Sequence, residues 1–269
     1  MRASFRCTKK PASLTLAFWP LFVCLSIALS CEVQADAMQP VNPTHLPTDL
    51  RDVAPQAVNP LEPFRKLIVI GFMGGNVNAS NTVHREALLI ESLQQSYPHA
   101  IHAAIFANRH GAAALKSILD LLDKDGDGHL SDDEKNNARI VIFGHSWGAS
   151  ETVSLSRRLN QLGIPVLLTV QVDSVQKKSE NDERIPPNVQ EAVNFYQSEG
   201  LLRGRSRIVA TDPEKTTVLG NYQSSYRENP ISCAGYPWYA RAFMKRHIQI
   251  ENDPAIWSKV EALILAKIR

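Results

Sequence analysis

Short apolar runs rich in Ile and Val alternate along the chain with longer segments whose apolar residues recur every three or four positions. The apolar runs predict buried β-strands over 67–72, 100–107, 139–144, 166–172 and 206–211. The periodic segments predict amphipathic helices over 80–97, 111–122, 149–162 and 253–268. We therefore expect an α/β fold with a mostly parallel central sheet and helices on both faces, because that arrangement buries such strands completely. Ligands of these sheets bind beyond the carboxyl ends of the strands, so candidate chemistry is sought there.

The N-terminal segment follows a different pattern. A basic stretch over 2–10 precedes an apolar run over 14–30, and small residues follow around Ala35. This order is typical of a secretory signal peptide, so we expect cleavage after Ala35 or Ala37 and export to the periplasm or the extracellular space. Pro20 interrupts the run, whereas a transmembrane anchor needs about 20 apolar residues, so no transmembrane span is expected in the mature chain. Cys31 ends a stretch that loosely resembles a lipobox, and lipid anchoring through Cys31 is the alternative.

The segment 36–63 is rich in proline and has no apolar periodicity. Proline fixes φ and removes an amide donor, so this segment is predicted to be an extended linker. The predicted organisation is a signal peptide over 1–35, a Pro-rich linker over 36–63 and an α/β domain over 64–269.

Composition narrows the class of protein further. The formal net charge of the 269 residues is only +2 and charged residues make up 21%, which argues against disorder and against a dedicated nucleic-acid binder. We therefore expect no nucleic-acid partner. Four cysteines are too few for a disulfide scaffold, and only Cys233 lies beyond the predicted signal peptide.

The strand predicted over 139–144 leads directly into Gly144-His145-Ser146-Trp147-Gly148, and a helical pattern follows. This is G-x-S-x-G between a strand and a helix, where a sharp turn excludes side chains at the flanking positions and exposes the Ser hydroxyl at a helix N-terminus. On these residues the chain resembles the α/β-hydrolase superfamily, in its lipase/esterase branch, from about residue 67 to the C-terminus. The resemblance implies an α/β-hydrolase fold and a serine ester hydrolase with Ser146 as nucleophile.

The resemblance also implies a chain order of serine, then acid, then histidine. His247 is the only histidine after Ser146, so it is the implied base. The acid should follow a strand between these two residues, and both Asp173 and Asp212 do so. We favour Asp173, because the stretch after it resembles the lipase arrangement, and Asp212 stays the alternative.

An oxyanion hole needs two backbone N–H groups. The resemblance assigns one of them to Trp147, the residue after the nucleophile. The loop after the first strand reads Gly71-Phe72-Met73-Gly74-Gly75 and resembles the corresponding lipase loop, which implies Phe72 as the second donor.

A second motif lies over 123–134 and matches the twelve-residue EF-hand loop, with Gly128 at its sharp turn. The predicted calcium ligands are Asp123, Asp125, Asp127, His129 (through its carbonyl), Ser131 and Glu134. The loop enters the strand of Ser146 from its far end, roughly 20 Å away at 3.3 Å per residue, so we expect a structural Ca²⁺ ion.

The sequence thus predicts a secreted serine hydrolase of carboxylic esters, acting on a small-molecule or lipid ester and carrying a structural calcium site. The alternative from another class is an exported, non-catalytic calcium-binding scaffold or adhesion module built on a hydrolase fold. The order of Ser146 and His247 favours the enzyme.

Overall fold

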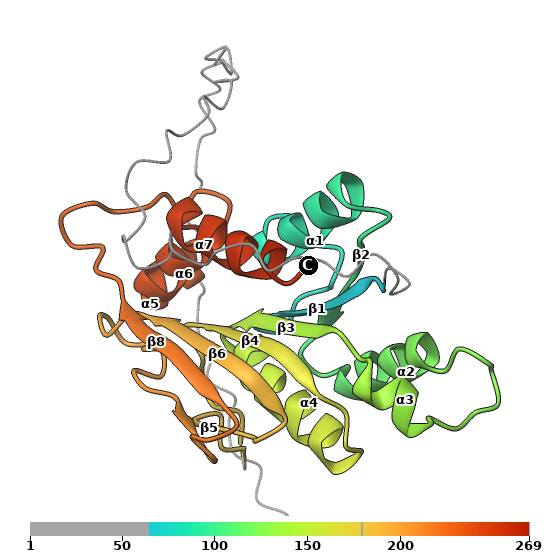
Figure 1. Ribbon diagram of the computed structural model, residues 1–269. Helices are drawn as coiled ribbons and strands as arrows, with labels where there is room; N and C mark the ends of the chain where they lie inside the picture. The colour runs from blue at the N-terminus through green and yellow to red at the C-terminus, as the bar shows by residue number, and fades with distance from the viewer. Residues whose placement is uncertain (1–64, 179, 269) are drawn as a thin grey trace, which may run out of the picture. The chain divides into compact units, whose positions relative to one another are not determined.

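The computed structural model describes residues 65–178 and 180–268, all of which belong to one compact unit (Figure 1). The predicted signal peptide over 1–35, the linker over 36–63 and Cys31 lie outside the described residues. Among the described residues, no helix is both long enough and apolar enough to cross a membrane.

A six-stranded sheet forms the centre of the fold, in the order β2-β1-β3-β4-β6-β8. Its strands are β1 (Leu67–Met73), β2 (Ile101–Ala107), β3 (Ile140–His145), β4 (Val166–Val172), β6 (Val189–Tyr196) and β8 (Thr217–Gln223). Every neighbouring pair is parallel. His145 at the end of β3 lies opposite Val172 at the end of β4, so these strands finish at one level. The predicted α/β fold class, with a mostly parallel central sheet, is confirmed.

Helices cover both faces of the sheet, and Figure 1 shows them as two layers. One layer holds α1 (Arg85–Ser96), α6 (Lys245–Glu251) and α7 (Pro254–Leu265), and the other holds α2 (Gly111–Leu122) and α4 (Trp147–Gln161). The short helices α3 (Asp132–Asn136) and α5 (Trp238–Phe243) lie in connections, and β5 (Arg184–Ile185) and β7 (Val209–Ala210) form a separate two-stranded sheet.

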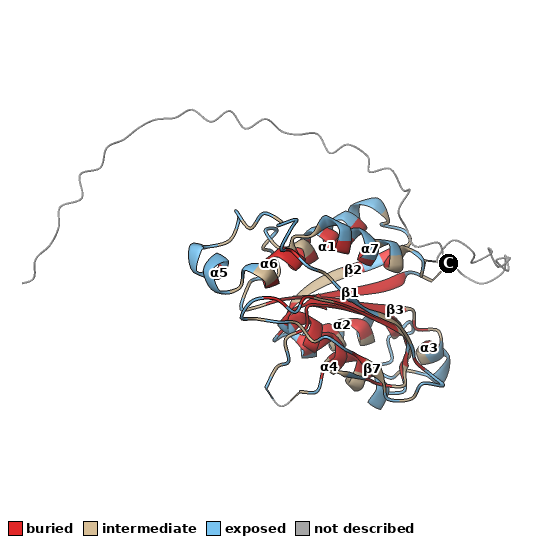
Figure 2. Ribbon diagram, turned by 90° about the vertical axis from the view of Figure 1, so that its left-hand side faces the viewer, coloured by how far each residue is buried: buried red, intermediate tan, exposed pale blue. Residues whose placement is uncertain are grey.

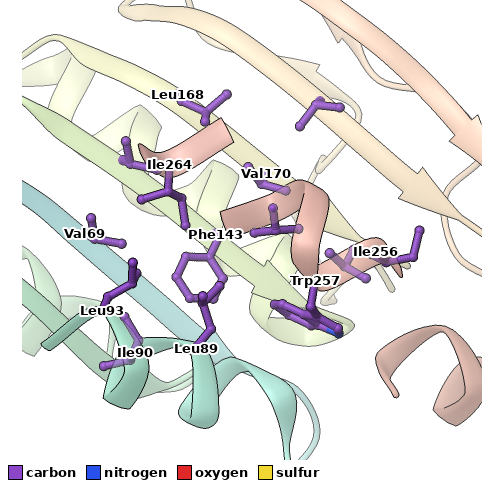
Figure 3. Close-up of a cluster of buried hydrophobic side chains, with 14 of the residues drawn as sticks. Val69, Leu89, Ile90, Leu93, Phe143, Leu168, Val170, Ile256, Trp257 and Ile264 are labelled. Carbon is purple, nitrogen blue, oxygen red and sulfur yellow. The ribbon is translucent and has the colours of Figure 1, made fainter. Parts of the chain in front are cut away.

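Successive residues of a strand point to opposite faces of the sheet, so the apolar strand residues contribute to two cores, one on each face of the sheet. Val69 and Phe143 face α1 and α7, where the Phe143 ring lies 6.1 Å from the ring of Trp257 (Figure 3). Ile70 and Ile142 face the opposite way, against α2 and α4. Figure 2 shows the central strands buried between these layers. Burial of each such side chain contributes roughly 1.5–3 kcal/mol, which holds the strand ends in place beneath the site.

Several predicted elements have the observed bounds or nearly so. The helix over 111–122 and the strand over 166–172 agree with α2 and β4 residue for residue. The helix predicted over 80–97 begins later, at Arg85, because a series of turns occupies the residues before it. The strand predicted over 206–211 is wrong as part of the central sheet: only Val209–Ala210 is extended, and it pairs with β5. The sheet continues beyond β4 with β6, which pairs with β4, and β8, which pairs with β6; the apolar pattern did not predict these two strands.

Candidate active site

Ser146 occupies the sharp turn between β3 and α4. Its backbone has φ 56° and ψ −122°, a conformation that L-residues rarely adopt, and its N–H donates to the Val172 carbonyl at 3.0 Å. A Cβ on Gly144 would lie 2.5 Å from the backbone of Gly148, and a Cβ on Gly148 would lie 2.2 Å from the Phe72 carbonyl oxygen. Both flanking positions therefore require glycine, which is the steric reason for the G-x-S-x-G pattern.

Asp173 and His247 come together at the end of the neighbouring strand. Asp173 follows β4, and its Oδ2 lies 2.6 Å from Nδ1 of His247 on α6. Gln197 donates to both carboxylate oxygens, from its backbone N–H to Oδ1 and from its side-chain Nε2 to Oδ2, each at 2.9 Å. Asp173 is completely buried and His247 nearly so, which protects this pair from competing water.

The alternative acid, Asp212, lies elsewhere. It follows β7, and its side chain accepts from the backbone N–H of Glu214 at 3.1 Å and faces Lys215 at the surface. The structure therefore brings Asp173 to His247 and leaves Asp212 in a turn outside the sheet.

A cavity of about 480 Å³ opens beside Ser146 and His247, and both residues line it. Much of its wall is apolar, including Val77, Val83, Val175, Tyr239, Met244 and Ile248. The cavity can thus accommodate an apolar group next to the Ser146 hydroxyl.

The two expected amide donors differ in position. Trp147 is the first residue of α4, and its N–H belongs to the first turn, where helix amides have no intrahelical acceptor. Phe72 lies inside the paired part of β1, opposite Phe106 on one side and Gly144 on the other, and its side chain is buried in the core. Of the described residues, those that line the cavity include Gly74 but not Phe72.

A group of buried ionisable side chains adjoins His247, and sequence reasoning missed it. His145 follows Gly144 in the turn motif, and its ring centroid lies 4.4 Å from that of His247. Its Nδ1 is 3.7 Å from Glu86 Oε1 and 3.6 Å from Glu251 Oε2. Burial raises the pKa of Glu86 to about 8, and the Glu251 carboxylate adds to that shift, while burial lowers the pKa of His145 to about 4. Glu251 also contacts His84, 167 positions earlier in the chain, so no local motif could reveal the group.

The 123–134 loop connects α2 to α3 and gathers carboxylates. Ligand oxygens of Asp123, Asp125 and Glu134 all lie within 4.8 Å of one another. Asp123 accepts the backbone N–H groups of Gly126 at 2.8 Å and Gly128 at 3.0 Å. Both glycines have positive φ, of 72° and 81°, which the tight loop requires.

The remaining predicted ligands of the loop are less closely gathered. Asp127 is outside the three-carboxylate group and accepts the N–H of His129 at 2.7 Å. Ser131 caps α3, and its hydroxyl donates to Glu134 at 2.8 Å. Backbone N–H groups around Glu134 lower the pKa of its carboxyl, the Lys124 amide above all. An all-oxygen donor set of this kind fits Ca²⁺.

The parallel sheet, the sharp turn after β3 and the acid–histidine pair at the end of β4 and on α6 define an α/β-hydrolase fold. No protein-family model matches the chain, and no curated protein matches its sequence.

Similar solved structures include an arylesterase, at 14% identity and a TM-score of 0.41, over 76% of this chain and 77% of that one. Another is the RedJ thioesterase of the prodiginine pathway in Streptomyces coelicolor, at 10% identity and a TM-score of 0.38, over 81% and 96%. A third is a cutinase-like protein from Cryptococcus sp., at 12% identity and a TM-score of 0.37, over 76% and 95%. At these identities and TM-scores, function has to be argued from the residues of this chain.

Proposed function

We propose that this protein is a secreted serine hydrolase of carboxylic esters in which Ser146, His247 and Asp173 form a catalytic triad. One observation carries the proposal: Ser146, held at φ 56°, and His247, bonded to Asp173, line the same largely apolar cavity. A buried acid–histidine pair beside a strained serine is the arrangement that acyl transfer requires.

In the proposed reaction, Ser146 Oγ attacks the acyl carbon of the ester. His247 donates its Nδ1–H to Asp173, so Nε2 is the nitrogen that takes the serine proton. His247 then returns this proton to the leaving alcohol oxygen as the ester C–O bond breaks. Water, activated by the same nitrogen, cleaves the acyl-enzyme and regenerates Ser146. Asp173 stays ionised throughout, fixes the imidazole tautomer and stabilises the imidazolium.

The developing oxyanion needs two N–H donors, and the Trp147 amide is the first. The resemblance implies Phe72 as the second, and this stays our prediction: Phe72 lies opposite Gly144 of the turn motif, in the last pair that joins β1 to β3. Pairing of β1 with β3 ends at Phe72, and the Gly74 N–H already donates to Glu86 at 3.2 Å. Loss of one such donor typically costs about 10²–10³-fold in kcat.

The substrate class follows from the cavity. Its apolar wall suits the acyl or alcohol part of a small-molecule or lipid ester.

Calcium has a structural part in this proposal. Asp123, Asp125 and Glu134 would hold Ca²⁺, together with Asp127, the His129 carbonyl and Ser131. The ion would pin the connection between α2 and β3, and no step of the reaction passes through it.

The enzymatic proposal is tested with a fluorophosphonate probe and a panel of p-nitrophenyl esters. The probe should label the purified protein and not Ser146→Ala, and the variant should lose at least about 10⁴-fold in kcat. Ser206→Ala, at an exposed serine, is the matched control and should behave like the parent. Equal labelling of parent and Ser146→Ala would remove the assignment, and no turnover of any ester would favour the non-catalytic scaffold.

Export is tested separately by N-terminal sequencing of the protein recovered outside the cytoplasm. Cleavage after Ala35 gives a chain that begins at Asp36. An acylated chain that begins at Cys31 would show a lipoprotein instead, and an uncleaved chain would contradict the signal peptide.

A further inference from the structure

Four ionisable side chains from distant parts of the chain converge next to the triad. His84 directly precedes α1, Glu86 lies in its first turn, His145 ends β3 and Glu251 ends α6. Glu86 is 0% exposed, His145 2% and Glu251 3%. His84, His145 and Glu251 line the cavity that Ser146 also lines. We call these four residues the His–Glu cluster.

Within the described part of the chain, the polar atoms of the His–Glu cluster are incompletely satisfied. Neither ring nitrogen of His145 has a hydrogen-bond partner there, and neither does Glu86 Oε2. The ion pairs of Glu86 and Glu251 in that part of the chain involve only histidines. Buried carboxylates without a Lys or Arg partner are costly unless they share a proton or coordinate a metal.

The spacing of His145 from the two carboxylates favours a metal ion, while His84 Nδ1 is hydrogen-bonded directly to Glu251 Oε1. His145 Nδ1 lies 3.7 Å from Glu86 Oε1 and 3.6 Å from Glu251 Oε2, beyond normal hydrogen-bond length. Ligands at 2.0–2.2 Å from a tetrahedral zinc ion are about 3.3–3.6 Å apart, which nearly matches these separations. Donor atoms of His84, Glu86 and Glu251 also lie within 4.8 Å of one another.

We propose that His84, Glu86, His145 and Glu251 bind one divalent transition-metal ion of the Zn²⁺ class. Two imidazoles and two carboxylates are the mixed nitrogen and oxygen donors that such ions prefer, whereas Ca²⁺ and Mg²⁺ prefer oxygen alone. The site is separate from the 123–134 loop, and it does not depend on the proposed ester hydrolysis. A bound ion would tie α1, β3 and α6 together and so fix the helix that carries His247.

The test is a titration of chelator-treated mature protein with Zn²⁺ alone, in competition with a chromophoric chelator. Ca²⁺ is kept in excess so that the 123–134 loop does not contribute. We expect one Zn²⁺ per chain. Glu86→Gln and His84→Gln should each weaken binding by at least about 10–100-fold, the loss typical of even an outer-shell partner. His110→Gln, at an exposed histidine outside the cluster, is the control and should bind as the parent does.

Two further measurements keep the test decisive. Tetrahedral Co²⁺ absorbs strongly in the visible range, so Co²⁺ added to the parent protein should give that spectrum even if a variant fails to fold. Ser146→Ala is titrated in parallel, because it should bind Zn²⁺ normally whether or not the protein is a hydrolase. Absence of Zn²⁺ binding to the parent would overturn the proposal, as would unchanged affinity in folded Glu86→Gln and His84→Gln.

Discussion

Replacement of Asp173 by Asn tests the proposed triad most directly. The Asp173 carboxylate faces three N–H groups: the backbone N–H of Gln197 at Oδ1, and Gln197 Nε2 and His247 Nδ1 at Oδ2. An amide has one acceptor oxygen, so one N–H of Gln197 loses its partner in either orientation of the Asn side chain. Because the site is buried, we expect a loss of about 1–3 kcal/mol in the free energy of unfolding.

The neighbours of Gln197 indicate which orientation Asn adopts. Gln197 Nε2 also donates to the Leu202 carbonyl at 2.8 Å, so it keeps one bond if Asp173 Oδ2 becomes an NH₂ group. The backbone N–H of Gln197 has a single hydrogen and would lose its only partner. The Asn oxygen should therefore face that backbone N–H, and its NH₂ group should face His247.

An NH₂ group in this position would force a proton onto Nε2 of His247, which then could not accept the Ser146 proton. The expected loss in kcat is about 10⁴-fold, or about 5 kcal/mol. The assay is kcat/KM for a p-nitrophenyl ester, with Asp212→Asn as the matched control at parental activity. The proposed role of Asp173 is wrong if the kcat/KM of folded Asp173→Asn stays within tenfold of that of the parent, or if Asp212→Asn loses as much kcat/KM.

Three other variants probe the same arrangement and the calcium loop. A Cβ on Gly204 would lie 1.9 Å from Asp173 Oδ1, so Gly204→Ala should displace the carboxylate and lower kcat/KM by about 10²-fold. A kcat/KM equal to that of the parent would show that the position of the carboxylate does not matter. Gln197→Ala removes the side-chain N–H that Gln197 donates to Asp173 and keeps the backbone N–H. We expect kcat/KM to fall roughly tenfold, the effect of losing one hydrogen bond to a charged group. A loss as large as that of Asp173→Asn would contradict this expectation. Calcium at about 100 times its Kd should stabilise the protein by about 2.7 kcal/mol, which raises Tm by roughly 5–10 °C in melts with and without chelator. Asp123→Asn should abolish this shift, whereas Asp132→Asn, at a side chain 98% exposed, should keep it; identical melts for both variants would remove the calcium site.

The turn around Ser146 could be predicted from sequence because its constraints are local. Gly144 and Gly148 are imposed by backbone contacts within one strand–turn–helix unit, and that unit is contiguous in the chain. Strands that are buried on both faces, such as β4, could also be predicted, because most of their residues are apolar.

Elements and contacts that depend on tertiary context could not be predicted. β6 contains Asn194, whose side chain is buried against β8 and donates to Asn221 at 3.1 Å, so neither strand has a continuous apolar run. The position of Phe72 relative to the cavity depends on where pairing of β1 with β3 ends, which the loop sequence does not reveal. The His–Glu cluster joins residues from the start of α1 to the end of α6, so only the folded chain brings them together.

Among the described residues, Ser146 and Asp173 are the two positions other than glycine with positive φ, at 56° and 45°. Such backbone conformations cost of order 1–3 kcal/mol each, and glycine would adopt them at far lower cost. Selection for stability alone would therefore favour glycine at Ser146, whereas the three N–H groups that the buried Asp173 carboxylate accepts offset the strain at that position. The proposed enzyme therefore loses some stability at Ser146, the position where its chemistry needs a hydroxyl.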